Sequence, residues 1–438
     1  MLVFLSDTHL TDGKIGDAKD PGDFETLKGG AFQKFTTYLE QMADKALENS
    51  HEREVEIVLL GDIFDVIRSK VWLDTDVRPW SPVGYRDGVG KSLEDYTLEI
   101  VDKIIDNEQN KSSHTHLAEF VAKMAKKEKP IHVNFTYIIG NHDWLINQFP
   151  STRKKMAEFL NLDQAHYEEH QFETFMYWDK YRVFARHGDI YDPWNFEGDR
   201  NASSLGDAIV IELLTRFSYT VESQIGRNTD PDLVDRLSQI DYIKHYADIP
   251  AWIIGACNRA RNQAAAEKVK RIWGDLVRLF NENEFVAMHN TFNPLDLVDK
   301  LHYGLGVSNL LTFPELDWVF HSKLGFGSGK LWKKAYNEQY ARRHQAEFIL
   351  YGHTHEYEIV PLDIIRDRTK DLEQIYFNTG TWRKLWSRTV HDATEYEFMN
   401  WNTMTFIVFY LDDERLDRTS RGGPKEGRKF EVWNGALD

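Results

Sequence analysis

The chain has 438 residues, of which 42% are hydrophobic and 28% charged, as in ordinary globular proteins. Its 53 basic and 70 acidic residues give a formal net charge of −17. This balance disfavours non-specific nucleic-acid binding, which relies on a net positive surface. The length predicts two or three domains, or one domain with a large insertion. Because Cys257 is the only cysteine, no intrachain disulfide can form and a cysteine-based metal site is not expected.

The N-terminal residues 1–7 are too short and too uncharged to resemble a signal peptide, and they are typical of a strand. The sequence contains no run near the ~20 continuous apolar residues that a membrane-spanning helix needs. We therefore expect a cytoplasmic protein without a transmembrane segment.

Strands and helices alternate along most of the chain, which predicts an α/β fold. A helix is expected over residues 31–49, followed by helical patterns at 93–104 and 117–124 and by a hairpin at 172–186. The other expected strands are at 2–5, 54–60, 132–139, 347–351, 374–378, 403–411 and 429–433. Between them the pattern is mostly helical, and Val269 to Phe280 follow the spacing of an amphipathic helix. We predict a catalytic domain at 1–193 and 346–438, interrupted at 194–345 by a helical insertion that acts as a lid or substrate-selecting cap.

Polar side chains follow five of the expected strands at the point where each strand ends. They are Asp7, His9, Asp62, Asn141, His142, His187, His353 and His355. All of them carry nitrogen or oxygen donors suited to divalent metal ions. In an extended segment, residues two apart share a face, so each Asp-x-His or His-x-His pair could hold one ion. Seven ligands, with His142 left aside, suit two ions ~3.5–4 Å apart, and Asp62 is the natural bridging carboxylate.

The order of these motifs carries more information than any one of them. The chain reads Asp-x-His, Gly-Asp-x-x-Asp, Gly-Asn-His-Asp, His-Gly and Gly-His-x-His, between Asp7 and His355. This series closely resembles the calcineurin-like metallophosphoesterases. The resemblance implies a four-layer α/β/β/α sandwich with its active site at the C-terminal ends of the strands.

The same resemblance implies a role for each residue. One ion would be held by Asp7, His9 and His355, the other by Asn141, His187 and His353, and Asp62 would bridge them. A water or hydroxide between the ions would attack phosphorus in line. His142 would protonate the leaving oxygen or stabilise the phosphoryl charge, and Asp143 would orient His142. The ions are expected to be Mn first, with Fe, Zn, Co or Ni also suited to these ligands.

Comparison with three kinds of metallophosphoesterase narrows the expected activity. Purple acid phosphatases have a tyrosine where this chain has Asp65, so an iron-tyrosinate centre is not expected. UDP-2,3-diacylglucosamine pyrophosphatases share the His-Gly-Asp element and a helical insertion, but typically have arginine in place of His142. Gly-Asp-x-Phe-Asp and Gly-Asn-His-Asp also resemble double-strand-break repair nucleases, although the acidic balance and the lack of a long basic tail disfavour DNA.

We therefore expect a phosphomonoesterase or phosphodiesterase acting on a small or nucleotide-like substrate. A pyrophosphatase for a nucleotide-sugar or lipid-linked substrate is the alternative, a nuclease ranks third, and a non-catalytic scaffold like the related retromer subunit ranks last. His114 and His116 repeat the two-residue spacing, but they are expected to precede a helix and not to bind metal. For Arg342, Arg343 and Arg383, a solvated charge is favoured over a phosphate contact.

Overall fold

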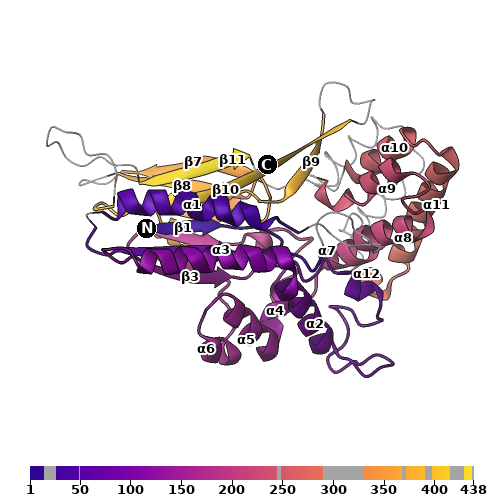
Figure 1. Ribbon diagram of the computed structural model, residues 1–438, viewed down its shortest axis with the longest axis horizontal. Coiled ribbons are helices and arrows are strands. Elements are labelled where there is room, and N and C mark those ends of the chain that lie inside the picture. Colours follow the sequence, from indigo (N-terminus) through magenta and orange to yellow (C-terminus); the bar gives the residue numbers. More distant parts are fainter. Residues whose placement is uncertain are drawn as a thin grey trace.

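The computed structural model describes residues 1–13, 26–48, 50–243, 248–289, 330–366, 371–389, 397–414 and 429–436. Two mixed β-sheets form its centre, and long helices lie beside them (Figure 1). Within the described residues, no helix combines the length and the apolar character needed to cross a membrane.

The first sheet has the strand order β11-β10-β1-β2-β3, with β9 paired to β10 outside this path. Strands β1, β2 and β3 run parallel, whereas β10 is antiparallel to β1, β11 and β9. The parallel strands therefore end at the same edge of the sheet. The bounds are β1 Leu2–Leu5, β2 Glu54–Leu60, β3 His132–Ile138, β9 Lys384–Arg388, β10 Phe398–Phe409 and β11 Phe430–Ala436.

The second sheet has the order β4-β5-β6-β8-β7. Its inner strands β5, β6 and β8 are parallel, and the edge strands β4 and β7 are antiparallel to their neighbours. This sheet again directs the ends of its parallel strands to one edge. The bounds are β4 Phe175–Trp178, β5 Val183–Arg186, β6 Phe348–Tyr351, β7 Tyr357–Ile365 and β8 Leu372–Thr379.

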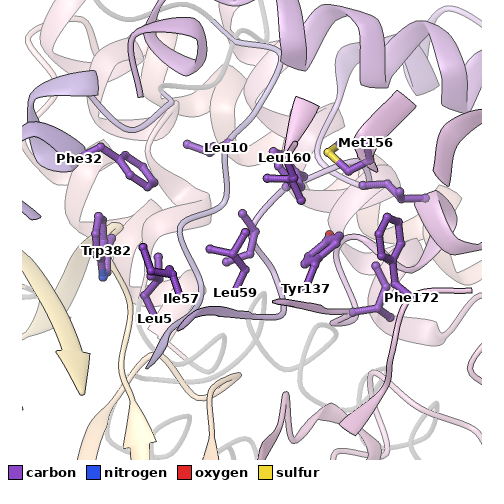
Figure 2. Close-up of a cluster of buried hydrophobic side chains, with 14 of the residues drawn as sticks. Leu5, Leu10, Phe32, Ile57, Leu59, Tyr137, Met156, Leu160, Phe172 and Trp382 are labelled. Carbon is purple, nitrogen blue, oxygen red and sulfur yellow. The ribbon is translucent and has the colours of Figure 1, made fainter. Parts of the chain in front are cut away.

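Three buried clusters define four layers. Phe4 and Val58 from the first sheet share an apolar core with Ala185 and Leu350 from the second, so the sheets pack face to face. The other face of the first sheet packs against helices through residues such as Leu5, Phe32, Ile57 and Trp382 (Figure 2). The outer face of the second sheet packs against the segment containing two short helices, α15 (Trp332–Ala335) and α16 (Gln339–Arg342). The predicted α/β/β/α sandwich is confirmed.

The helices on the first sheet include α1 and α3, whose long axes run beside each other in Figure 1. Ser92 begins α2 with a capping box, and the side chain of Asn107 caps α3, so both helices start where the sequence supplies a polar cap. The bounds are α1 Gly29–Ala46, α2 Leu93–Asp106, α3 Glu108–Ala125, α4 Trp144–Gln148, α5 Pro150–Phe159 and α6 Gln164–Glu169.

A second helical body lies to one side of the sheets (Figure 1). Its elements are α7 Leu205–Ala208, the π-helix η3 Ile209–Thr215, α8 Arg216–Gln224, α9 Pro231–Leu237, the 3-10 turn η4 Ile240–Tyr242, α10 Ile249–Asn258, α11 Gln263–Asn281 and α12 Glu284–Met288. Apolar side chains of these elements form a core of their own. The stripe from Val269 to Phe280 is buried on α11, in agreement with the amphipathic pattern of the sequence. We call these residues, 205–289, the insertion.

Strands β9 and β10 reach from the first sheet to the insertion. The C-terminal half of β10 pairs with β1 and β11, whereas its N-terminal residues 398–402 pair with β9. Phe398 belongs to the insertion core, and its ring meets Trp252 of α10 edge-on at 5.0 Å between centroids. We call the paired segments 384–388 and 398–402 the arm. The sequence did not predict it, because a closing strand was expected only from residue 403.

The structure also tests the predicted strands, the hairpin and the position of His114 and His116. Strands at 2–5 and 54–60 and the hairpin are confirmed. His114 and His116 lie within α3 and not before it, so that detail was wrong; their side chains share no metal-sized cluster of donors within the described residues. The polar loop at 418–428 lies outside the described residues. The domain boundaries at 193 and 346 stay a prediction.

The contact between Trp252 and the arm gives a test of how the insertion is held. Trp252 is fully buried, its ring lies 4.9 Å from that of Trp386, and its indole N–H donates to Arg236 O at 3.1 Å. Trp252→Ala should lower the free energy of unfolding by about 3–5 kcal/mol, because it leaves a large cavity. Trp401→Ala, at a 45% exposed position in the arm, should cost less than about 1 kcal/mol. Denaturant unfolding measures both, and equal losses would contradict the anchoring role.

Candidate metal centre

The polar strand ends of both sheets meet at one place. The backbone N–H of Asp7 donates to Gly61 O at 3.1 Å, and that of His9 to Asp62 O at 3.0 Å, so the loops after β1 and β2 are joined. In the second sheet, Gly352 N–H donates to His187 O at 2.8 Å. Thr381, which follows β8, donates from its hydroxyl to Asp7 O at 2.7 Å and links the two sheets. The parallel topology therefore gathers residues separated by more than 300 positions.

The first group of donors is formed by Asp7, His9 and His355. Nε2 of His9 lies 2.9 Å from Nε2 of His355, and Oδ1 of Asp7 lies 3.3 Å from Nε2 of His355. Three donor atoms therefore point to one small space. This is the set that the family resemblance assigned to one ion.

The second group is formed by Asp62, His187 and His353. Nε2 of His187 lies 3.1 Å from Oδ2 of Asp62, and Nδ1 of His353 lies 3.0 Å from Oδ1 of Asn141. The same Oδ2 of Asp62 lies 3.9 Å from Nε2 of His9, so Asp62 faces both groups. All seven side chains expected to bind metal are thus brought together.

One expectation about spacing was wrong. His353 and His355 belong to different groups of donor atoms, whereas the spacing predicted that they would share one. The backbone is left-handed at both residues, with φ +70° at His353 and +59° at His355, so the rule for an extended strand does not apply to them. It does not apply to Asp7 and His9 either, with φ +52° and +45°, although these two share a group. Residues two apart share a face only where the backbone is extended.

Left-handed backbone is concentrated at this site. Among the described residues, eight non-glycine positions have positive φ, and five of them are expected metal ligands: Asp7, His9, Asp62, His353 and His355. Such conformations cost about 1–3 kcal/mol each and persist only where the surroundings enforce them. The backbone strain lowers the folding stability, and in return it directs the ligand side chains toward one another. Such strain is typical of a functional site.

The donor set fits divalent metal ions. Oδ1 of Asp7 and Nε2 of His187 are buried without a hydrogen-bond partner among the described residues, although Asp62 Oδ2 lies 3.1 Å from the latter. A buried polar atom without a partner is costly, and an ion would satisfy both. Burial alone would lower the pKa of His187, but the carboxylates of Asp62 and Asp7 raise it to about 10. The space between the two groups therefore favours positive charge.

Gly61 and Gly140, which precede Asp62 and Asn141 in their motifs, leave no room for a side chain. Gly61 has φ +79°, and a Cβ there would lie 2.5 Å from the His187 ring. A Cβ at Gly140 would lie 2.6 Å from the backbone nitrogen of Asp62. Any side chain at these positions would push apart the loops that carry the ligands.

Asp65, not Asp143, is the partner of His142. Oδ1 of Asp65 lies 2.9 Å from Nδ1 of His142, and Oδ2 lies 2.8 Å from Nδ1 of His9. Burial alone would raise the pKa of Asp65, but the Arg68 guanidinium and the His142 imidazole hold it well below its usual range. In the sequence, Asp65 ends the Gly-Asp-x-x-Asp motif and stands where purple acid phosphatases have a tyrosine, but neither fact predicts its contact with His142.

Asp143 has a different environment. Its carboxylate accepts hydrogen bonds from Ile63 N–H at 3.1 Å, Gly140 N–H at 2.6 Å and Tyr137 hydroxyl at 2.6 Å. These contacts fix the loops after β2 and β3 beneath the site. The structure therefore gives no support for the expectation that Asp143 orients His142, and Asp143 holds the two loops together.

The site also contains residues that belong to none of the sequence motifs. Oδ2 of Asp192 lies 3.0 Å from Nε2 of His353, and the amide of Asn195 accepts from Asn141 at 3.2 Å. Arg383 is only 7% exposed and pairs with Asp241, so the expectation of a solvated charge was wrong for this arginine. No motif in the sequence marks Asp192 or Asn195 as part of the site.

The sheet sandwich and the gathered histidines and carboxylates indicate a metal-binding protein with its site at the strand ends. Residues 1–357 match the family model of the calcineurin-like phosphoesterases, and the chain belongs to this family. It is therefore a metal-dependent hydrolase of phosphate esters, in agreement with the motif series. A comparison with curated protein sequences gave no match.

The environment of Asp143 leads to a test of its role. Asp143→Asn should lower the free energy of unfolding by about 1–3 kcal/mol, since an amide has one acceptor oxygen for three buried donors. Denaturant unfolding of the metal-free protein measures the effect, with Asp363→Asn at an exposed position as the control. An unchanged stability would contradict the loop-fixing role.

Proposed function

We propose that this protein is a dinuclear phosphoesterase in which Asp62 bridges the two ions. The assignment puts Asp7, His9 and His355 on one ion, and Asn141, His187 and His353 on the other. The position of Asp62 carries the proposal, because its Oδ2 lies 3.1 Å from Nε2 of His187 and 3.9 Å from Nε2 of His9. One carboxylate oxygen facing both donor groups is what a bridged pair of ions needs.

The ions would supply positive charge to the phosphoryl oxygens and lower the pKa of the attacking water. Within the chain, His142 is the residue suited to move a proton. Its Nδ1 is held by Asp65 at 2.9 Å, which leaves Nε2 to protonate the leaving oxygen. Asp65 fixes the ring as carboxylates do for other catalytic imidazoles.

The proposed substrate is a phosphomonoester or phosphodiester of a small or nucleotide-like molecule, and manganese is the first choice of metal. The net charge of −17 argues against a nucleic-acid polymer. A pyrophosphatase for a nucleotide-sugar or lipid-linked substrate is the second candidate. The insertion favours it, because the helices at 205–289 precede the last motif, as in the pyrophosphatases that the sequence resembles.

The metal dependence can be tested directly. The purified protein should contain about two divalent ions per chain by elemental analysis, and Asp62→Asn should lower that number, because the shared carboxylate is lost. The metal-loaded protein should hydrolyse nitrophenyl mono- or diesters, and chelation should abolish turnover. A protein that takes up no Mn, Fe, Co, Ni or Zn and shows no metal-stimulated turnover would contradict the proposal.

His142→Ala gives a separate test of the proton donor. The variant should keep its metal content but lose about 10²–10⁴-fold in turnover of alkyl phosphate esters, whose leaving groups need a proton. Nitrophenyl esters should be affected much less, since nitrophenolate leaves without protonation. A fall in metal occupancy would show that His142 acts as a ligand and not as the acid.

A further inference from the structure

A chain of buried charges leads away from the candidate acid. Asp65, which holds His142 and His9, also forms an ion pair with the guanidinium of Arg68. The backbone N–H of Arg68 donates to Oδ1 of Asp65 at 3.0 Å. Arg68 is only 1% exposed, so its charge has to be balanced by protein groups.

The far side of Arg68 is held by the insertion. Nε of Arg68 forms an ion pair with Oδ2 of Asp241, which lies in η4. The same oxygen accepts from Nη2 of Arg383 at 2.7 Å. Asp241 is 5% exposed and separated from Asp65 by 175 intervening residues. A carboxylate from the insertion is therefore only one side chain away from the partner of His142.

The segment that carries Asp241 is itself fixed. Gln239 accepts from the indole N–H of Trp386 at 2.9 Å, and Ile243 forms an isolated β-bridge with Trp386 of the arm. The guanidinium of Arg383 lies over the Tyr242 ring at 4.6 Å from its centroid. These contacts leave Asp241 little freedom and make it a rigid support for Arg68.

We propose that Asp241 is a positioning residue for the phosphoesterase reaction, acting through Arg68 and Asp65 on His142. Arg68 has two carboxylate partners on different nitrogen atoms, Asp65 on Nη1 and Asp241 on Nε, and this fixes the guanidinium and with it the orientation of Asp65. The proposal rests on the proposed function, because it takes His142 as the proton donor. It makes the insertion part of the catalytic machinery and not only a cap over it.

The competing interpretation is that Asp241 only docks the insertion. The two interpretations predict that kcat falls for different substrates. Loss of docking affects all substrates alike, whereas a misplaced His142 affects only esters whose leaving group needs a proton. The ratio of kcat for nitrophenyl esters to kcat for alkyl esters therefore separates them.

Asp241→Asn is the first variant to measure. Loss of an outer partner of a site residue typically costs ~10–100-fold, so we expect kcat to fall by about that factor on alkyl esters and by less than about threefold on nitrophenyl esters. The matched control is Glu212→Gln, which breaks the ion pair of the insertion with Arg78 (2.6 Å) but has no contact with Asp65 among the described residues. The control should leave the ratio unchanged.

A charge-balanced variant addresses the possibility that Asp241→Asn unfolds. Asp241→Asn with Arg383→Gln removes one negative and one positive buried group, so the net charge of the network is kept. If Asp241 acts by holding Arg68, the double variant should still show the selective loss on alkyl esters. A wild-type ratio in the double variant would mean that net charge and not positioning matters, and would overturn the proposal.

A readout without metal or turnover completes the test. In the metal-free protein, the Nδ1–H protons of His142 and His9 should give downfield NMR signals that His142→Ala helps to assign. The His142 signal should be lost by faster exchange in Asp241→Asn and kept in Glu212→Gln. Equal loss on both ester types, or an unchanged signal, would overturn the role of Asp241. A wild-type protein without turnover would instead contradict the proposed function and this inference with it.

Discussion

The structure depends on keeping three carboxylates together inside the protein. Asp7, Asp62 and Asp65 are each no more than 1% exposed, and like charges buried near one another repel strongly in a medium of low polarity. Imidazoles surround Asp7 and Asp62, and Arg68 balances Asp65. The ends of the parallel strands and the left-handed loop residues hold these groups in place. Oδ1 of Asp7 and Nε2 of His187 still have no hydrogen-bond partner among the described residues, and divalent ions would satisfy both atoms.

Much of the centre could be predicted from the sequence, because its signals are local. Apolar runs ending in Asp, Asn or His mark strand ends, and parallel strands bring such ends to one edge. What could not be predicted arises from contacts between distant segments. Asp241 lies in an ordinary Ile-Asp-Tyr stretch, and only the packed insertion brings it to Arg68. The partner of His142 was misassigned because Asp143 is its neighbour in sequence, whereas Asp65 is its neighbour in space.

The insertion contacts the catalytic layers at several separate points. Glu212 pairs with Arg78, and Asp207 accepts from the indole N–H of Trp144, two residues after His142. Asp241 adds the contact with Arg68. Each contact joins a charged or polar group of the insertion to a segment that follows β2 or β3. The insertion thus contributes to the ordering of these segments.

The arm has a mechanical consequence. β10 is one continuous strand of 12 residues, anchored by β1 and β11 at one end and by the insertion core at the other. A swing of the insertion away from the site would have to bend this strand or pull Phe398 off Trp252. The paired strand resists bending, and it therefore limits how far the insertion can move away from the two sheets. A hinge motion of the insertion relative to the sheets would therefore have to deform paired strand backbone and not a loop.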